Sequence, residues 1–219
     1  MFAAARHEQH ATRRVPGGLL LRERRPARHT PRRVLLMPGS RKQEIARMLP
    51  LMLQIELPDT EFILAGAPGR TPEFYESLIE ASGRGDSVTL YMNRTYEWLP
   101  QVDAAIVTSG TATLETALFG VPQVVVYKGS PISYWLARRL INVSYISLVN
   151  LILDRPLVRE LIQAEATPDR ITTELASLLQ AEERQRLWQG YAELRKVLGG
   201  PGASARAAET IIDLATGSK

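Results

Sequence analysis

The chain has 219 residues, 45% of them hydrophobic, and contains no cysteine. Its length allows one large domain or two small ones, and the lack of cysteine excludes a disulfide framework, thiol catalysis and thiolate metal sites. All three histidines lie within the first thirty residues. The rest of the chain therefore has no histidine base, no Ser-His-Asp triad and no histidine metal ligand. No apolar run is long enough to span a membrane.

The N-terminal segment is strongly basic. Residues 1–33 contain nine Arg and two acidic residues, whereas the remainder has 18 Lys and Arg against 21 Asp and Glu. Such a segment can be an arm for nucleic acid or an anionic membrane, a transit-type sequence, or an extension without function. Because no aromatic residue is interleaved with the arginines, the third interpretation is favoured and nucleic acid is not expected as a partner. We expect residues 1–32 to form a disordered leader.

From residue 33 onward, short apolar runs alternate with helical patterns. The predicted strands cover residues 34–37, 62–65, 88–91, 104–107 and 123–127. Between them, one helix is expected to begin at Ser40, and others to cover 72–81, 95–99 and 112–119. This alternation is typical of βαβ units and predicts a parallel, Rossmann-like sheet with flanking helices. Ligands of such sheets bind beyond the carboxyl ends of the strands.

The first predicted helix carries two local signals. Ser40 followed by Gln43 has the spacing of a capping box, which places Ser40 at the helix N-cap. Pro50 lies inside the helical pattern, so a kink or a break into two helices is expected there.

The last seventy residues have a helical pattern throughout. Helices are predicted over residues 131–141, 156–163, 168–179 and 182–198, followed by a break at Gly199–Gly202 and a final amphipathic helix over 203–214. The predicted organisation is therefore a Rossmann-like domain over 33–198 and a C-terminal linker and helix over 199–219.

The segment Ser109–Thr116 is the most informative part of the sequence. It joins an apolar strand to an amphipathic helix through small residues, which is the arrangement that exposes backbone N–H groups and a positive helix end to a phosphate. Glu115 lies one helical turn after Thr111, on the same face. A carboxylate beside a phosphate site can bind a sugar diol. The alternative is an ordinary capped helix with a solvated glutamate.

Residues 34 to about 198 resemble the C-terminal domain of the lipid-A-disaccharide synthase family. Five blocks carry the resemblance in matching order and spacing: residues 36–45, 108–115, 131–140, 145–152 and 157–163. The resemblance implies the C-terminal half of a GT-B glycosyltransferase fold. It also implies transfer of 2,3-diacylglucosamine from UDP-2,3-diacylglucosamine to lipid X, at the cytoplasmic face of the inner membrane of a Gram-negative bacterium.

The resemblance assigns roles to residues at the predicted rim of the sheet. It implies a donor diphosphate site formed by Gly39, Ser40, Arg41, Ser109, Gly110 and Thr111, with Glu115 binding the ribose. Glu44 would orient Arg41. Asn150 and Gln163 would contact the donor sugar, although Asn150, in an apolar run, can equally hold a loop in place. We expect no metal ion and no cofactor besides the UDP-sugar substrate.

The family's N-terminal domain, which supplies the acceptor pocket and a catalytic acidic residue, has no counterpart here. We therefore expect a donor-binding part that is inactive alone. The final helix, with Ile211, Ile212 and Leu214, would expose an apolar stripe that binds a separate N-terminal-domain chain or a second copy. Other GT-B enzymes, such as a UDP-N-acetylglucosamine transferase or an epimerase, and a non-catalytic UDP-sugar binding module are the alternatives.

Overall fold

The computed structural model of the chain describes residues 31–129, 144–199, 208 and 210–213. The leader up to residue 30 and the predicted helix over 131–141 lie outside the described residues. Of the predicted final helix, residues 208 and 210–213 are described and are helical.

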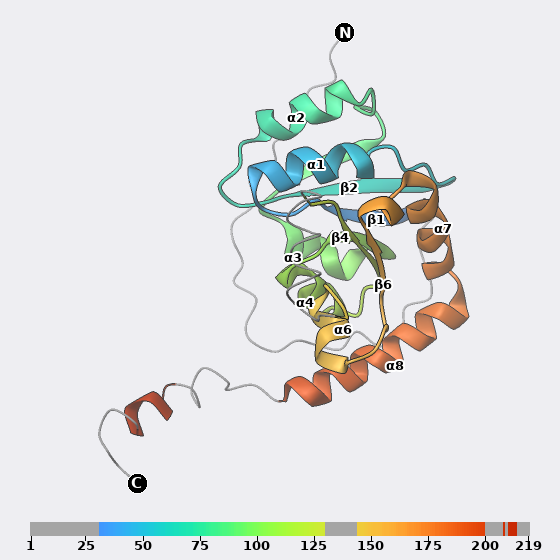
Figure 1. Cartoon of the computed structure of the whole chain (residues 1–219). Helices are drawn as coiled ribbons and strands as arrows, with labels where there is room; N and C mark the ends of the chain where they lie inside the picture. The colour runs from blue at the N-terminus through green and yellow to red at the C-terminus, as the bar shows by residue number, and fades with distance from the viewer. Residues whose placement is uncertain (1–30, 130–143, 200–207, 209, 214–219) are drawn as a thin grey trace.

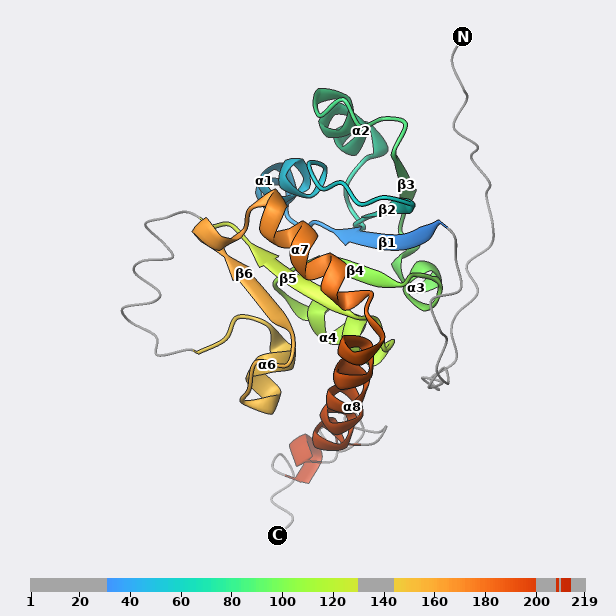
Figure 2. The same cartoon turned by 90° about the vertical axis from the view of Figure 1, so that its right-hand side faces the viewer.

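The centre of the molecule is a six-stranded parallel sheet (Figures 1 and 2). Its strand order is β3-β2-β1-β4-β5-β6. The strands are β1 (Arg32–Met37), β2 (Thr60–Gly66), β3 (Val88–Met92), β4 (Ala104–Thr108), β5 (Gln123–Tyr127) and β6 (Arg159–Ile162). This is the order of the Rossmann fold, in which the chain reverses its direction of winding between β1 and β4. The predicted fold class is therefore confirmed.

Helices connect the strands and cover both faces of the sheet (Figures 1 and 2). They are α1 (Lys42–Met52), α2 (Pro72–Ala81), α3 (Thr95–Trp98), α4 (Thr111–Leu118), α6 (Leu148–Leu153), α7 (Pro168–Leu178) and α8 (Ala181–Leu198), with 3₁₀ turns at Leu99–Gln101 and Gln163–Glu165. No helix of the described part has the length and apolar character needed to cross a membrane.

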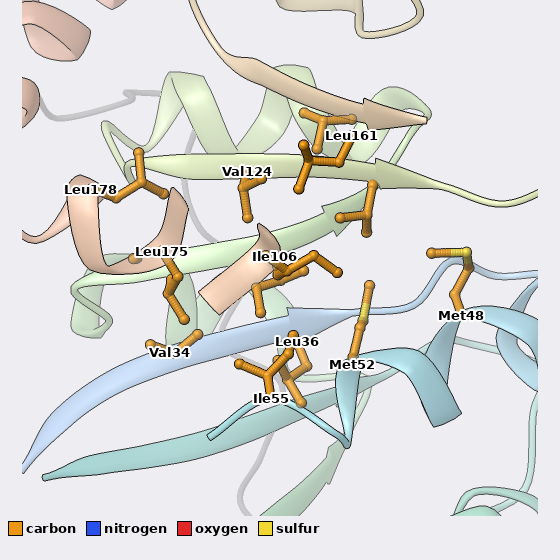
Figure 3. Packing of buried hydrophobic residues seen from close by; sticks show 14 of the residues in the cluster. Val34, Leu36, Met48, Met52, Ile55, Ile106, Val124, Leu161, Leu175 and Leu178 are labelled. Atoms are coloured by element: carbon orange, nitrogen blue, oxygen red, sulfur yellow. The ribbon is translucent and has the colours of Figure 1, made fainter. Parts of the chain in front are cut away.

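Alternation along β1 divides the core into two layers. Val34 and Leu36 belong to the larger cluster, which includes residues of α1, α7 and α8 (Figure 3). Leu35 and Met37 belong to the smaller cluster, against which Trp98 of α3 packs. Because successive side chains of a strand point to opposite faces, a strand that is apolar at every position must be covered on both sides. The buried run Val34–Met37 is therefore packed on both faces and fixes the position of the C-terminal end of β1.

Helix α8 fixes the connection between α4 and β5. The Trp188 indole donates a hydrogen bond to the Gly120 carbonyl at 2.9 Å, and the Tyr191 hydroxyl donates one to the Val121 carbonyl at 3.1 Å. Gly190 lets α8 lie against Leu157, whose side chain would be 2.3 Å from a Cβ at that position. The C-terminal helices are thus part of the same core as the sheet.

Three sequence predictions were wrong in detail. The segment predicted as a helix over 156–163 forms β6, which pairs with β5 at the edge of the sheet. Helix α1 continues through Pro50 to Met52, so the predicted alternative of a break into two helices is wrong. The N-cap of α1 is Arg41 rather than Ser40, and its side chain makes no capping hydrogen bond.

Candidate nucleotide-sugar site

Two turns meet at the carboxyl edge of the sheet, one after β1 and one after β4. Because β1 and β4 are neighbours at the switch point of the winding, their turns enclose a common cavity of about 340 Å³. That volume is within the range of small-molecule sites. The cavity is lined by Met37, Gly39, Ser40, Glu44, Ala65, Ala67, Pro68, Asn93, Thr95, Tyr96, Thr108, Ser109, Gly110, Thr111, Ala112 and Glu115.

The turn after β1 is built around Gly39 and Glu44. Gly39 has a φ of 100°, and a Cβ there would be 2.1 Å from Glu44 Oε2. The same oxygen accepts a hydrogen bond from the Ser40 backbone N–H at 3.1 Å. One half of a capping box therefore exists, in which the side chain of Glu44, rather than of the predicted Gln43, accepts from the backbone before the helix. The Glu44 side chain therefore binds the backbone of Ser40 instead of orienting Arg41.

Arg41 does not line the cavity. Its side chain is exposed and lies one residue beyond the lining residue Ser40. The predicted positive charge of Arg41 is therefore not part of the cavity lining.

The turn after β4 presents backbone donors. Gly110, with a φ of 159° and a ψ of −166°, is the N-cap of α4, and its carbonyl accepts hydrogen bonds from the Thr113 backbone and hydroxyl. Within the described part of the chain, the N–H groups of Gly110, Thr111 and Ala112 have no hydrogen-bond partner. Free N–H groups at the positive end of a helix form a site for an anion.

Ser109 differs from its predicted role. Its backbone N–H donates to the Val126 carbonyl at 3.2 Å, and its hydroxyl donates to the Ile146 carbonyl at 2.7 Å. Both of its donors are therefore engaged within the protein. Ser109 lines the cavity, but the free donors come from the residues that follow it.

Glu115 lines the cavity from the same face of α4 as Thr111, as the spacing predicted. Its Oε1 accepts a hydrogen bond from the Tyr96 hydroxyl at 2.8 Å. This hydrogen bond, followed by burial and the charge of Glu115, raises the pKa of Tyr96. Tyr96 was missed in the sequence because a tyrosine in a short helix gives no signal of a partner 19 positions away.

The charge inside the cavity is negative. Its lining includes the carboxylates of Glu44 and Glu115, and neither Lys nor Arg is among the described lining residues. The donors that the turn after β4 offers to an anion are therefore backbone N–H groups.

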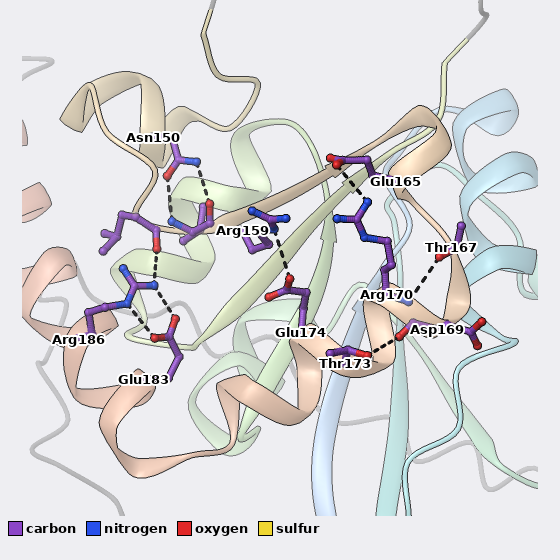
Figure 4. A network of polar contacts seen from close by, with 12 residues as sticks. Asn150, Arg159, Glu165, Thr167, Asp169, Arg170, Thr173, Glu174, Glu183 and Arg186 are labelled. Atoms are coloured by element: carbon purple, nitrogen blue, oxygen red, sulfur yellow. Dashed lines mark hydrogen bonds and ion pairs between the residues drawn. The ribbon is translucent and has the colours of Figure 1, made fainter.

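Asn150 lies away from the cavity and has a structural role (Figure 4). Its side chain is 1% exposed, donates to the Val158 carbonyl at 2.8 Å and accepts from the Val158 N–H at 2.9 Å. It also donates to Glu160 Oε1 at 2.8 Å. Of the two sequence interpretations, the geometry favours the one in which Asn150 holds a loop.

Glu160 is the centre of this loop's hydrogen bonding. Besides Asn150, it accepts from the N–H groups of Ile146 and Ser147 and from the Ser147 hydroxyl, at 2.7–3.0 Å. Ile146 in turn accepts the hydroxyl of Ser109. A continuous set of contacts therefore joins β6 to the turn after β4.

Gln163 is at the carboxyl end of β6 and has a φ of 53°. Its Oε1 accepts from the Gly129 N–H at 3.2 Å, whereas its Nε2 is buried without a partner among the described residues. It does not line the cavity described above. Among the described residues, no group of three or more His, Cys, Asp and Glu side chains is arranged to hold a metal ion.

The fold is that of one half of a GT-B glycosyltransferase. Solved structures share this fold at low sequence identity. A glycosyltransferase involved in lipopolysaccharide biosynthesis, WaaG, is 17% identical with a TM-score of 0.53, matching 84% of this chain and 48% of its own. Spinosyn rhamnosyltransferase SpnG is 20% identical with a TM-score of 0.56, and the match covers 84% of this chain and 46% of SpnG.

The chain belongs to the lipid-A-disaccharide synthase family. The family model described as lipid-A-disaccharide synthetase matches residues 21–212. The lipid-A-disaccharide synthase of Syntrophus aciditrophicus is 41% identical over 188 residues, which are 83% of this chain and 49% of that protein. The lipid-A-disaccharide synthase of Geobacter sulfurreducens is 38% identical over 191 residues, which are 84% of this chain and 49% of that protein. The chain thus spans about half the length of the curated relatives it matches.

Proposed function

We propose that this domain binds the UDP-sugar donor of lipid A disaccharide synthesis, UDP-2,3-diacylglucosamine, for transfer to lipid X. The observation that carries the proposal is the position of Glu115. Its carboxylate lines the cavity one helical turn after the unpartnered backbone N–H groups at the start of α4. A carboxylate can accept hydrogen bonds from the two hydroxyls of a ribose, and the free N–H groups can donate to a diphosphate. A nucleoside diphosphate carries both groups.

Each part of the donor has a proposed partner. The N–H groups of Gly110 and Thr111 and the backbone at Gly39 and Ser40 would hold the diphosphate, with Arg41 closing over it from the rim. Glu115 would accept hydrogen bonds from the ribose hydroxyls. Gln163, whose amide nitrogen is buried without a described partner, is a proposed donor-sugar contact.

The proposed chemistry is direct displacement of UDP with inversion at the sugar carbon. Helix N-termini and Arg41 would stabilise the charge that develops on the leaving diphosphate, so no resident metal or cofactor is required. The base that takes the acceptor proton is expected from the part of the family's length that this chain does not span. A separate chain carrying that part, or a second copy, is the proposed partner.

Both substrates carry acyl chains, so we propose that the reaction takes place at a membrane surface, the cytoplasmic face of the inner membrane. Vesicle flotation with purified chain tests this part of the proposal. Co-flotation with anionic vesicles that grows with diacylglucosamine content would support it.

Calorimetric titration of the full chain with UDP and with uridine tests donor binding. We expect UDP to bind and uridine to bind much more weakly, because uridine lacks the diphosphate. Glu115→Gln should weaken UDP binding by about tenfold, since a charge-assisted hydrogen bond is lost. Glu76→Gln, an exposed change on α2, is the matched control. Equal affinities of both variants for UDP would contradict the proposal.

A transfer assay separates an enzyme part from a binding module. We expect no disaccharide from the chain with UDP-2,3-diacylglucosamine and lipid X, and product once the N-terminal half of a relative is added. UDP binding without transfer under both conditions would identify a non-catalytic module instead.

A further inference from the structure

The contact between Tyr96 and Glu115 joins two helices that are separate in the sequence. Tyr96 is in α3, at the carboxyl end of β3, and Glu115 is in α4, at the carboxyl end of β4. Both side chains line the cavity, and the Tyr96 hydroxyl is 2.8 Å from Glu115 Oε1.

The position of the hydroxyl is set by packing of the ring. The Tyr96 ring stacks on Phe119, with centroids 5.8 Å apart and planes at 28°. Arg94 and Glu97 form an ion pair at 2.7 Å across the first turn of α3, which stabilises this short helix. The ring is nevertheless 52% exposed, so water could solvate the hydroxyl without this partner. Burial alone therefore does not explain the contact.

A single hydrogen bond leaves the carboxylate able to bind a ligand. An ionised carboxylate has about four lone-pair sites on two oxygens. The Tyr96 hydroxyl uses one site on Oε1, which leaves Oε2 and the second site of Oε1 for a pair of neighbouring hydroxyl groups. The bond therefore fixes the orientation of the Glu115 carboxylate without blocking it.

We infer that Tyr96 is a positioning residue for the nucleotide-sugar site, holding the Glu115 carboxylate in the orientation that accepts a ribose diol. The inference rests on the proposed function. A glutamate side chain loses substantial rotamer freedom when it is fixed, so a protein that fixes it in advance reduces the cost of binding. Without the tyrosine hydroxyl, the ligand itself would have to order Glu115.

The test is Tyr96→Phe in the full chain, because phenylalanine keeps the ring that stacks on Phe119 and removes only the hydroxyl. Binding of UDP and of 2′,3′-dideoxy-UDP is measured by calorimetry. We expect UDP binding to weaken by about fivefold, in the range of one partly exposed hydrogen bond to a charge, and dideoxy-UDP binding to change by less than about twofold. Tyr91→Phe, whose ring packs on Trp98 outside the cavity lining, is the matched control and should change neither.

A mutant cycle with Glu115→Gln gives a second, independent readout. In that background Tyr96→Phe should cause no further loss of UDP affinity, because there is no carboxylate left to orient. Equal losses for UDP and dideoxy-UDP, or additive losses in the cycle, would overturn the inference while leaving donor binding intact. Absence of UDP binding by the unmodified chain would instead refute the proposed function, and the inference with it.

Discussion

The hydroxyl of Ser109 donates a hydrogen bond to the backbone carbonyl of Ile146, 37 positions away, at 2.7 Å. This contact connects the turn that begins the site to the loop that precedes α6. The turn is therefore held from outside the sheet as well as by its own strand.

Ser109→Ala removes this link. Because the Ile146 carbonyl loses its partner, we expect the free energy of unfolding to fall by about 1 kcal/mol. UDP affinity should change less than it does in Glu115→Gln, since both donors of Ser109 are already engaged. Urea denaturation and calorimetry measure the two effects. Ser77→Ala, whose hydroxyl bonds within its own helix turn, should change neither appreciably.

Glu160→Gln tests the loop's carboxylate. Glutamine has only one side-chain oxygen that can accept, and its NH₂ group would face N–H groups that now donate to Glu160. We therefore expect the free energy of unfolding, measured by urea denaturation, to fall by about 2 kcal/mol. Glu165→Gln removes an exposed ion pair with Arg170 and should cost less than about 1 kcal/mol. Similar losses for the two variants would show that the Glu160 network contributes little.

Gly39→Ala should disturb the turn after β1 in two ways. The positive φ is strained for alanine, and the new methyl group would displace Glu44. We therefore expect the free energy of unfolding, measured by urea denaturation, to fall by about 2 kcal/mol or more. Gly83 also has a positive φ, 68°, but open space at the Cβ position. Gly83→Ala should cost about 1 kcal/mol. The difference between the two variants measures the Glu44 contact, and no difference would refute its importance.

Stability should decrease above pH 10 because of Tyr191. Burial raises the pKa of this phenol above its ordinary value, so the unfolded chain loses the proton first. The unfolded state then binds fewer protons than the folded state, and the free energy of unfolding falls as pH rises, by up to about 1.4 kcal/mol per pH unit. Urea denaturation between pH 8 and 11 measures the slope. Tyr191→Phe should reduce the slope, and an unchanged slope in this variant would contradict the role of the Tyr191 phenol.

The C-terminal segment exposes two large apolar side chains, Ile211 at 66% and Ile212 at 58%. Light scattering of the double variant Ile211→Gln and Ile212→Gln should show less self-association than the unmodified chain. Val197→Gln, at an equally exposed position on α8, is the control. If the unmodified chain stays monomeric at every protein concentration tested, this expectation is contradicted.

Five of the six strands could be predicted because each is an apolar run bounded by Gly, Pro or polar residues. The exception is β6. Arg159–Ile162 has mixed polarity, and its conformation depends on pairing with β5 rather than on its own sequence. Its edge position also explains why Glu160 is available to bind a loop.

For the site, local patterns located the two turns and Glu115 but not the partners that orient them. Glu44 and Tyr96 act through side-chain contacts, and which contact forms depends on rotamers and on elements brought together by the fold. The donor capacity of Ser109 was overestimated for the same reason, because its acceptor lies in a distant loop.

The two carboxylates of the cavity have a consequence for selectivity. A strongly cationic pocket would bind any small anion, including inorganic phosphate and pyrophosphate. A pocket lined by Glu44 and Glu115, with its cation outside, repels small anions that bring nothing for a carboxylate to bind. On the proposed function, the ribose hydroxyls of a UDP-sugar donate hydrogen bonds to Glu115 and offset that repulsion, whereas a phosphate without hydroxyl groups has nothing to offset it.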